Sequence, residues 1–94
     1  MVEFKSRSSW NNLKNRIQKG QRITGVVIRS EVFGVFIDIG EPFEGLVLTP
    51  YMSRKLKNGL EDYPKIGEVI TGTVLDFSSG NDLQNAYVSI SLKE

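Results

Sequence analysis

The pattern of hydrophobic and polar positions divides the chain into a helical start and a longer run of strands. A buried helix face needs apolar residues three to four positions apart, and this spacing occurs at Trp10, Leu13 and Ile17. We predict a helix over residues 9–19, with Ser9 as its N-cap and Gly20 as the left-handed residue at its end. Because a helix of this length is marginal alone, we expect its apolar face to pack against one end of the following domain.

From residue 21 onward the pattern becomes that of short β-strands. Five segments rich in Ile, Val, Thr or Phe are separated by turn residues, and they cover residues 21–30, 32–39, 44–48, 67–77 and 86–92. Residues 51–67 lack alternation, so we expect a long connection there, with a helical turn around 53–57. Five short strands with a long third connection favour a closed all-β barrel of the OB type, and an SH3-like barrel is the alternative.

Alternation also predicts which aromatic side chains face outward. In the last strand, Tyr87 alternates with the apolar positions and is expected on the outer face. In the second strand, Val35 and Ile37 are expected inside the barrel, so Phe36 faces outward. Strict alternation would turn Phe33 inward, whereas a β-bulge at Gly34 would let both phenylalanine rings face solvent.

The length and composition indicate a single domain that lacks the commonest catalytic residues. A chain of 94 residues has room for a single domain, and it contains no apolar run long enough for a membrane span. We see no secretory signal and therefore expect a cytoplasmic protein. The absence of cysteine and histidine removes disulfides, thiolate metal sites, the usual general base and the commonest metal ligand. We therefore expect neither an enzyme nor a cofactor.

A net charge of +1 conceals an uneven distribution of charge along the chain. Residues 1–30 contain seven basic residues and one acid, and residues 31–53 contain four acids and no base. Local basic patches favour a polyanionic partner, although the alternative is that these side chains only solvate the surface. The candidate phosphate contacts are Lys14, Arg16, Lys19, Arg22, Arg29, Arg54, Lys55 and Lys57. The acids Asp38, Glu41 and Glu44 lack the ligand spacing of a hard-cation site.

Several segments, in this order and spacing, resemble the S1 RNA-binding domain family. The segments are Gly25-Val26-Val27, the run from Phe33 to Gly40, Glu44-Gly45-Leu46-Val47, the run from Lys65 to Val69, and the closing run from Val88 to Lys93. The resemblance covers residues 20–94 and leaves 1–19 as a basic tip and lead-in helix. It implies an OB-fold barrel with an RNA-binding face on its second and third strands.

The resemblance also implies five contact positions on that face. Phe33 and Phe36 match the two aromatic residues of the family. Leu48 stands at the position of a family histidine, and Ser78 stands at the position of an aspartate. Tyr87 occupies the position of an arginine. Two of the five family contacts are therefore kept and three are replaced.

Two functions from different classes remain open. The first is a single-stranded RNA-binding module of low sequence preference in translation or RNA metabolism, with bases stacked on Phe33, Phe36 and Tyr87. The second is a protein-interaction module, in which these rings and Leu48 form an apolar patch. Basic side chains around the patch would favour RNA, whereas the acids Asp38 and Glu44 around it would favour a protein. We expect a monomer that binds RNA, with the ribosome or a protein as a further partner and no membrane.

Overall fold

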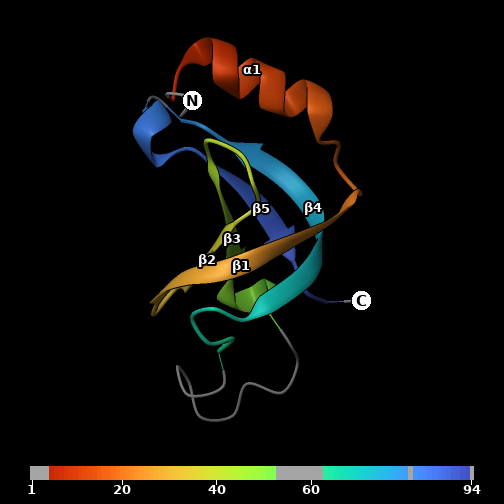
Figure 1. Ribbon diagram of the computed structural model, residues 1–94, viewed down its shortest axis with the longest axis vertical. Coiled ribbons are helices and arrows are strands. Elements are labelled where there is room, and N and C mark those ends of the chain that lie inside the picture. Colours follow the sequence, from red (N-terminus) through yellow and green to blue (C-terminus); the bar gives the residue numbers. More distant parts are fainter. Residues whose placement is uncertain (1–4, 53–62, 81, 94) are drawn as a thin grey trace.

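The computed structural model describes residues 5–52, 63–80 and 82–93, which form a β-barrel with one helix across its end (Figure 1). The main elements are α1 (Arg7–Arg16), β1 (Arg22–Glu31), β2 (Gly34–Asp38), β3 (Glu44–Leu48), β4 (Val69–Ser78) and β5 (Tyr87–Ser91). Two short 3-10 turns accompany them, η1 (Thr49–Tyr51) and η3 (Leu83–Asn85). The barrel closes in the order β1-β2-β3-β5-β4, with β3 and β5 parallel. The predicted OB-type barrel is confirmed.

Branched apolar side chains from all five strands fill the barrel. The alternation predicted for β2 and β5 is confirmed, since their inward positions are buried while Phe36 and Tyr87 remain partly exposed. Each such burial stabilises the fold by roughly 1.5–3 kcal/mol. The fully buried branched residues are Val27, Val35, Ile37, Val47, Val74, Val88 and Ile90.

The β-bulge considered at Gly34 does not form, and the irregularity lies in the neighbouring strand. The register between β1 and β2 shifts between Val27 and Arg29, which leaves Ile28 as the extra residue. Phe33 lies in the turn before β2, so strand alternation does not govern its direction. Gly34 is needed for another reason, because a Cβ atom there would collide with the carbonyl oxygen of Val47 on β3.

The helix begins and ends earlier than its sequence pattern predicts. Ser6, rather than Ser9, is the N-cap, and its hydroxyl accepts a hydrogen bond from the Ser9 backbone N–H at 3.1 Å. The Ser9 hydroxyl in turn accepts one from the Ser6 backbone N–H at 2.9 Å, which completes a capping box. Ile17 is already extended, and Gly20 takes its left-handed φ of 87° three residues later, in the connection to β1.

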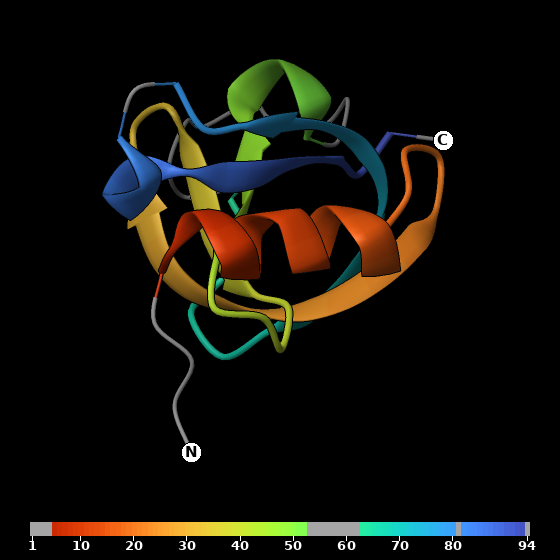
Figure 2. The ribbon, with the colours of Figure 1, turned by 90° about the horizontal axis from the view of Figure 1, so that it is seen from above.

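The helix closes one end of the barrel, as expected. Figures 1 and 2 show α1 lying across that end, above the strands. Trp10 is 1% exposed, and its ring packs edge-on against Phe43 at 4.8 Å and Phe77 at 6.1 Å. Leu13 and Ile17 are buried in the same core. The helix therefore shares the hydrophobic core of the barrel.

The helical turn predicted around residues 53–57 lies outside the described residues. Within the described ranges, no helix has the length and apolar character that crossing a membrane would need.

Candidate nucleic-acid interface

A groove of about 310 Å³ lies over the outer face of β2, β3 and β5. Its walls carry Phe36 and Tyr87, which were predicted to face outward, and Phe33, whose direction the pattern left open, together with charged and apolar neighbours. The residues that matter for its chemistry are Lys5, Arg29, Phe33, Phe36, Glu44, Leu48 and Tyr87. A second hollow of about 470 Å³ extends toward β4, and it shares Leu48 and Tyr87 with the groove. The two hollows therefore form one continuous surface.

The two phenylalanine rings lie side by side in this groove. Their centroids are 5.9 Å apart and their planes are perpendicular, with Phe33 48% exposed. The side chain of Phe36 is partly buried, with Phe33 on one side and the Arg29 guanidinium 4.0 Å from its ring centroid. Together they present an open aromatic surface on which a planar ligand can stack.

Hydrogen bonds fix the turn that carries Phe33. The Thr49 backbone N–H donates to the Phe33 carbonyl oxygen at 2.9 Å. The Tyr63 hydroxyl donates to the carbonyl oxygen of Val32 at 2.7 Å and lies 3.0 Å from the Thr49 hydroxyl. Two segments distant in sequence therefore hold the backbone of this turn. The hydrophobic pattern of the sequence did not predict these hydrogen bonds.

Arg29 covers part of the aromatic surface. The β1 bulge sets Arg29 opposite Phe36 in the β1–β2 register, and its guanidinium lies 4.0 Å from the Phe36 ring centroid. Its nitrogens are 3.6 Å from Glu44 and 3.7 Å from Glu31. Arg29 was a candidate from charge alone, and the bulge supplies the reason for its place in the groove.

Lys5 also lines the groove, although it was not among the candidate phosphate contacts predicted from the sequence. Its ammonium donates a hydrogen bond to the Gln84 carbonyl oxygen at 2.9 Å and lies 5.9 Å from the Phe43 ring centroid. Only the docking of the N-terminal segment beside η3 brings this cation to the groove.

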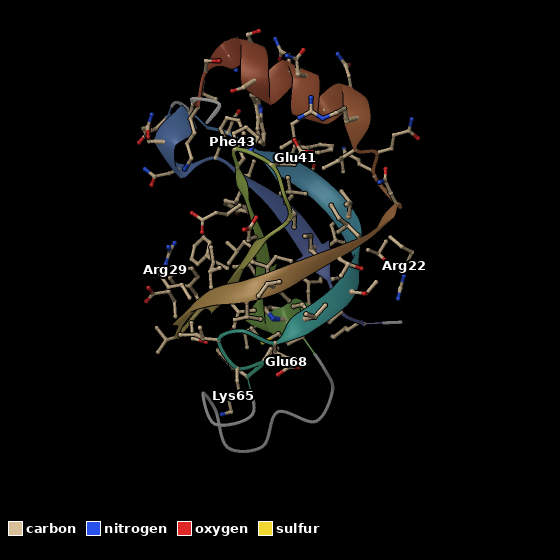
Figure 3. All side chains as sticks on the ribbon, in the orientation of Figure 1. Arg22, Arg29, Glu41, Phe43, Lys65 and Glu68 are labelled. Atoms are coloured by element: carbon tan, nitrogen blue, oxygen red, sulfur yellow. The ribbon has the colours of Figure 1, made fainter. Side chains whose placement is uncertain are left out.

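The other basic candidates lie elsewhere. Arg22 and Arg29 occupy opposite sides of the barrel, because they lie near opposite ends of β1 (Figure 3). Lys14 lies 5.9 Å from the Trp10 ring on the helix, and Arg16 pairs with Glu41. Three further basic candidates lie outside the described residues, namely Arg54, Lys55 and Lys57. The structure therefore brings Arg29, but not Lys14 or Arg22, to the aromatic groove.

Lys19 forms an ion pair with Asp76 at the edge of the second hollow. The distance between the ammonium and the carboxylate is 3.1 Å. The Phe77 backbone N–H donates to the same carboxylate at 2.8 Å. This backbone hydrogen bond, followed by Lys19, lowers the pKa of Asp76 below the usual 3.8.

The three acids that were considered as a cation site have separate partners. Asp38 accepts a hydrogen bond from the Gly40 backbone N–H at 2.8 Å, and Glu41 pairs with Arg16 on the helix (Figure 3 labels Glu41). Glu44 lies in the groove near Arg29. Across the described ranges, no group of three or more acidic, histidine or cysteine side chains could hold a metal ion.

The five positions singled out by the family resemblance meet on this surface. Phe33, Phe36, Leu48 and Tyr87 line the groove, and Ser78 lines the second hollow beside Leu48 and Tyr87. They come from four strands and one turn. Closure of the barrel alone places them together, because β3 lies between β2 and β5.

Comparison with known proteins gives consistent results. The sequence profile of the S1 RNA binding domain matches residues 16–92. The small ribosomal subunit protein bS1 of Chlamydia trachomatis serovar D is 29% identical over 85 residues, which is 90% of this chain and 14% of that protein. The 4-hydroxy-3-methylbut-2-enyl diphosphate reductase of Clostridium acetobutylicum is 28% identical over 93 residues, 99% of this chain and 14% of that enzyme. The chain thus spans a small part of each relative.

Solved structures share the barrel. The solution structure of GSP13 from Bacillus subtilis superposes with a TM-score of 0.66 and 21% identity, over 81% of this chain and 55% of that one. A chain of the a/eIF2alpha-aDim2p-rRNA complex from Pyrococcus horikoshii OT3 superposes with a TM-score of 0.65 and 17% identity, over 81% of this chain and 44% of that one. At these identities the comparison supports the fold.

Proposed function

The chain belongs to the S1 RNA-binding domain family, and from this premise we propose that it binds single-stranded RNA along the groove over β2, β3 and β5. One observation carries the proposal. Three aromatic residues from two distant parts of the sequence, Phe33 and Phe36 around the start of β2 and Tyr87 on β5, line the same open groove. Stacking of a base on such a ring is worth roughly 1–3 kcal/mol and is tolerant of sequence, because every base has a π-face.

The geometry suggests how bases are held. Phe33 is 48% exposed, so its ring is free to stack. The Arg29 guanidinium lies over Phe36, so a base in the groove stacks on the guanidinium or moves it aside. Either costs little free energy, because Arg29 is 49% exposed and its nitrogens lie more than 3.5 Å from both acids.

Two cations on the groove walls favour a polyanion. Arg29 lies on β1 and Lys5 precedes α1, and both line the groove beside the aromatic rings. Phosphates that follow the groove meet these charges, which makes the binding dependent on salt. Because stacking on aromatic rings does not distinguish between bases, the binding has low sequence preference.

The relatives suggest where such a module works. One is named as a ribosomal protein, and this chain matches 14% of its length. We propose that the domain brings RNA to a translation or RNA-processing assembly in the cytoplasm. Because the match to the reductase is also limited to 14% of that enzyme, its activity is not carried over to this chain.

The composition of the groove wall favours RNA over a protein partner. The competing hypothesis required acids around the aromatic residues, and Asp38 does not line the groove. Glu44 does, but it lies beside Arg29. Two basic residues against one paired acid support the RNA hypothesis.

An NMR titration tests this proposal. Labelled protein is titrated with a mixed single-stranded RNA of about six nucleotides, within the range that one OB fold covers, at low and at physiological salt. We expect the largest shifts at Phe33, Phe36, Tyr87 and Arg29, with weaker binding at higher salt. Ile66 is a control, since it is 70% exposed and lies outside the groove. The absence of shifts in the groove at low salt would contradict the proposal.

A further inference from the structure

Glu44 has a position in the groove that electrostatics alone does not explain. Its Oε2 atom is out of contact with solvent and accepts no hydrogen bond from the described residues. The nearest cationic group is Arg29 Nη1 at 3.6 Å, which is beyond the length of a hydrogen bond. A buried acceptor without a donor is costly, so such an atom in a native fold calls for an explanation.

The surroundings of Glu44 indicate what kind of donor would suit it. Its side chain is 29% exposed and lines the same groove as the aromatic rings. Glu44 lies opposite Tyr87 in the β3–β5 register, and the guanidinium beside it covers Phe36. The carboxylate therefore lies next to the aromatic surfaces, where the edge of a stacked base would come to rest.

We propose that Glu44 selects bases that carry an exocyclic amino group, such as cytosine, over uracil at one position in the groove. This inference rests on the proposed RNA binding. An ionised carboxylate is only an acceptor, and it pairs well with the amino group of cytosine. Uracil has a carbonyl oxygen at the same position, which would face the carboxylate as a second acceptor. The difference between the two bases is therefore largest at the atom that Glu44 would contact.

Arg29 is compatible with this role. The positively charged guanidinium lies beside the Glu44 carboxylate and offsets its repulsion of the RNA phosphates. The distances of 3.6 and 3.7 Å leave both acids free to accept from a better donor. Glu31 provides a matched control, because it is also an acid beside Arg29 but does not line the groove. A comparison of substitutions at Glu44 and Glu31 therefore distinguishes a general effect of charge from a direct contact with a base.

The experiment compares the dissociation constants of oligocytidylate and oligouridylate of equal length, measured by fluorescence anisotropy at neutral pH. The proteins are the unaltered chain, Glu44→Gln and Glu31→Gln, each checked by its thermal unfolding midpoint. We expect the unaltered chain and Glu31→Gln to bind oligocytidylate about tenfold more tightly. Glu44→Gln should bring the ratio close to one, because an amide both donates and accepts.

The ratio, rather than the absolute affinity, is the decisive quantity, since removing either acid strengthens binding to a polyanion. If both oligonucleotides bind the unaltered chain equally, or if Glu44→Gln keeps the ratio, the selection by Glu44 is overturned and RNA binding stands. A loss of selectivity in Glu31→Gln as well would assign the effect to charge and would also overturn the inference. If neither oligonucleotide binds, the proposed function itself fails.

Discussion

The helix-capped end of the barrel and the groove on its side use the same chemistry in different ways. Each has a pair of aromatic rings in an edge-to-face arrangement, with centroids 4.8 Å apart for Trp10 and Phe43 and 5.9 Å apart for Phe33 and Phe36. Each also has a cation over a ring, at 5.9 Å for Lys14 and at 4.0 Å for Arg29. The residue types alone do not distinguish the two regions.

Burial makes the difference. Trp10 and Phe43 are each 1% exposed, so their contacts are already complete within the fold and contribute to its stability. Phe33 is 48% exposed, and its ring keeps a free surface for a ligand. The lesson is that an aromatic pair is a binding site only where the barrel leaves it uncovered. Four predictions test this division, from the largest expected effect to the smallest.

Trp10→Ala should affect stability and leave the groove intact. Removing a fully buried aromatic side chain costs about 3–5 kcal/mol, because it opens a cavity beneath the helix. Urea unfolding measures this loss directly. The affinity of the molecules that remain folded for RNA should be unchanged. A strong loss of affinity in the folded fraction would show that the two regions are coupled.

Phe36→Ala should have the opposite effect. We expect RNA binding to weaken by about 1–3 kcal/mol, because one stacking surface is lost. Stability should fall less than in Trp10→Ala, since Phe36 is only partly buried. Isothermal titration calorimetry measures the affinity, and Ile66→Ala is the matched control for an exposed apolar residue outside the groove. Equal effects of the two substitutions would argue against a stacking site.

Arg29→Ala and Arg22→Ala form a pair on one strand. Loss of Arg29 should weaken RNA binding by about 1–2 kcal/mol. It should also lower the slope of log affinity against log salt concentration by about one, the amount expected for one phosphate contact. Loss of Arg22, on the other side of the barrel, should change both quantities little (Figure 3). Affinities measured over a series of salt concentrations test this. Similar slopes for the two variants would mean that the phosphates do not follow the groove.

The smallest effect is expected for Asp76, at the far edge of the second hollow. The Phe77 backbone N–H and Lys19 lower its pKa in the folded protein. The charged carboxylate therefore favours the fold above the pKa of the unfolded chain, and this contribution is lost as the pH falls through the lower folded pKa. An NMR titration of the carboxyl carbon should give a midpoint below 3.8.

The Lys19→Ala variant separates the two causes of this shift. Its Asp76 midpoint should rise but stay below 3.8, because the hydrogen bond from the Phe77 backbone N–H remains. A midpoint at the ordinary value in this variant would show that Lys19 is responsible for the whole shift.

Much of the fold followed from local patterns. The third strand was predicted at its observed bounds, because Glu44–Leu48 is a short apolar run between clear turn residues. The predicted helix begins about one turn too late, because both Ser6 and Ser9 are suitable N-cap residues. Ser6 is the N-cap, and Ser9 completes the capping box. The outward direction of Phe36 and Tyr87 followed from alternation, whereas the place of Phe33 in a turn did not.

The sequence by itself determined the barrel, its inner and outer faces and the outward direction of Phe36 and Tyr87. These follow from period-two alternation and turn chemistry, which depend on neighbours along the chain. Only the tertiary structure decided which charges join those rings. Lys5 and Arg29 reach the groove and Arg22 does not, because strand register, one bulge and the docking of the N-terminal segment bring distant residues together. Such contacts are set by the closure of the barrel, and no local pattern encodes them.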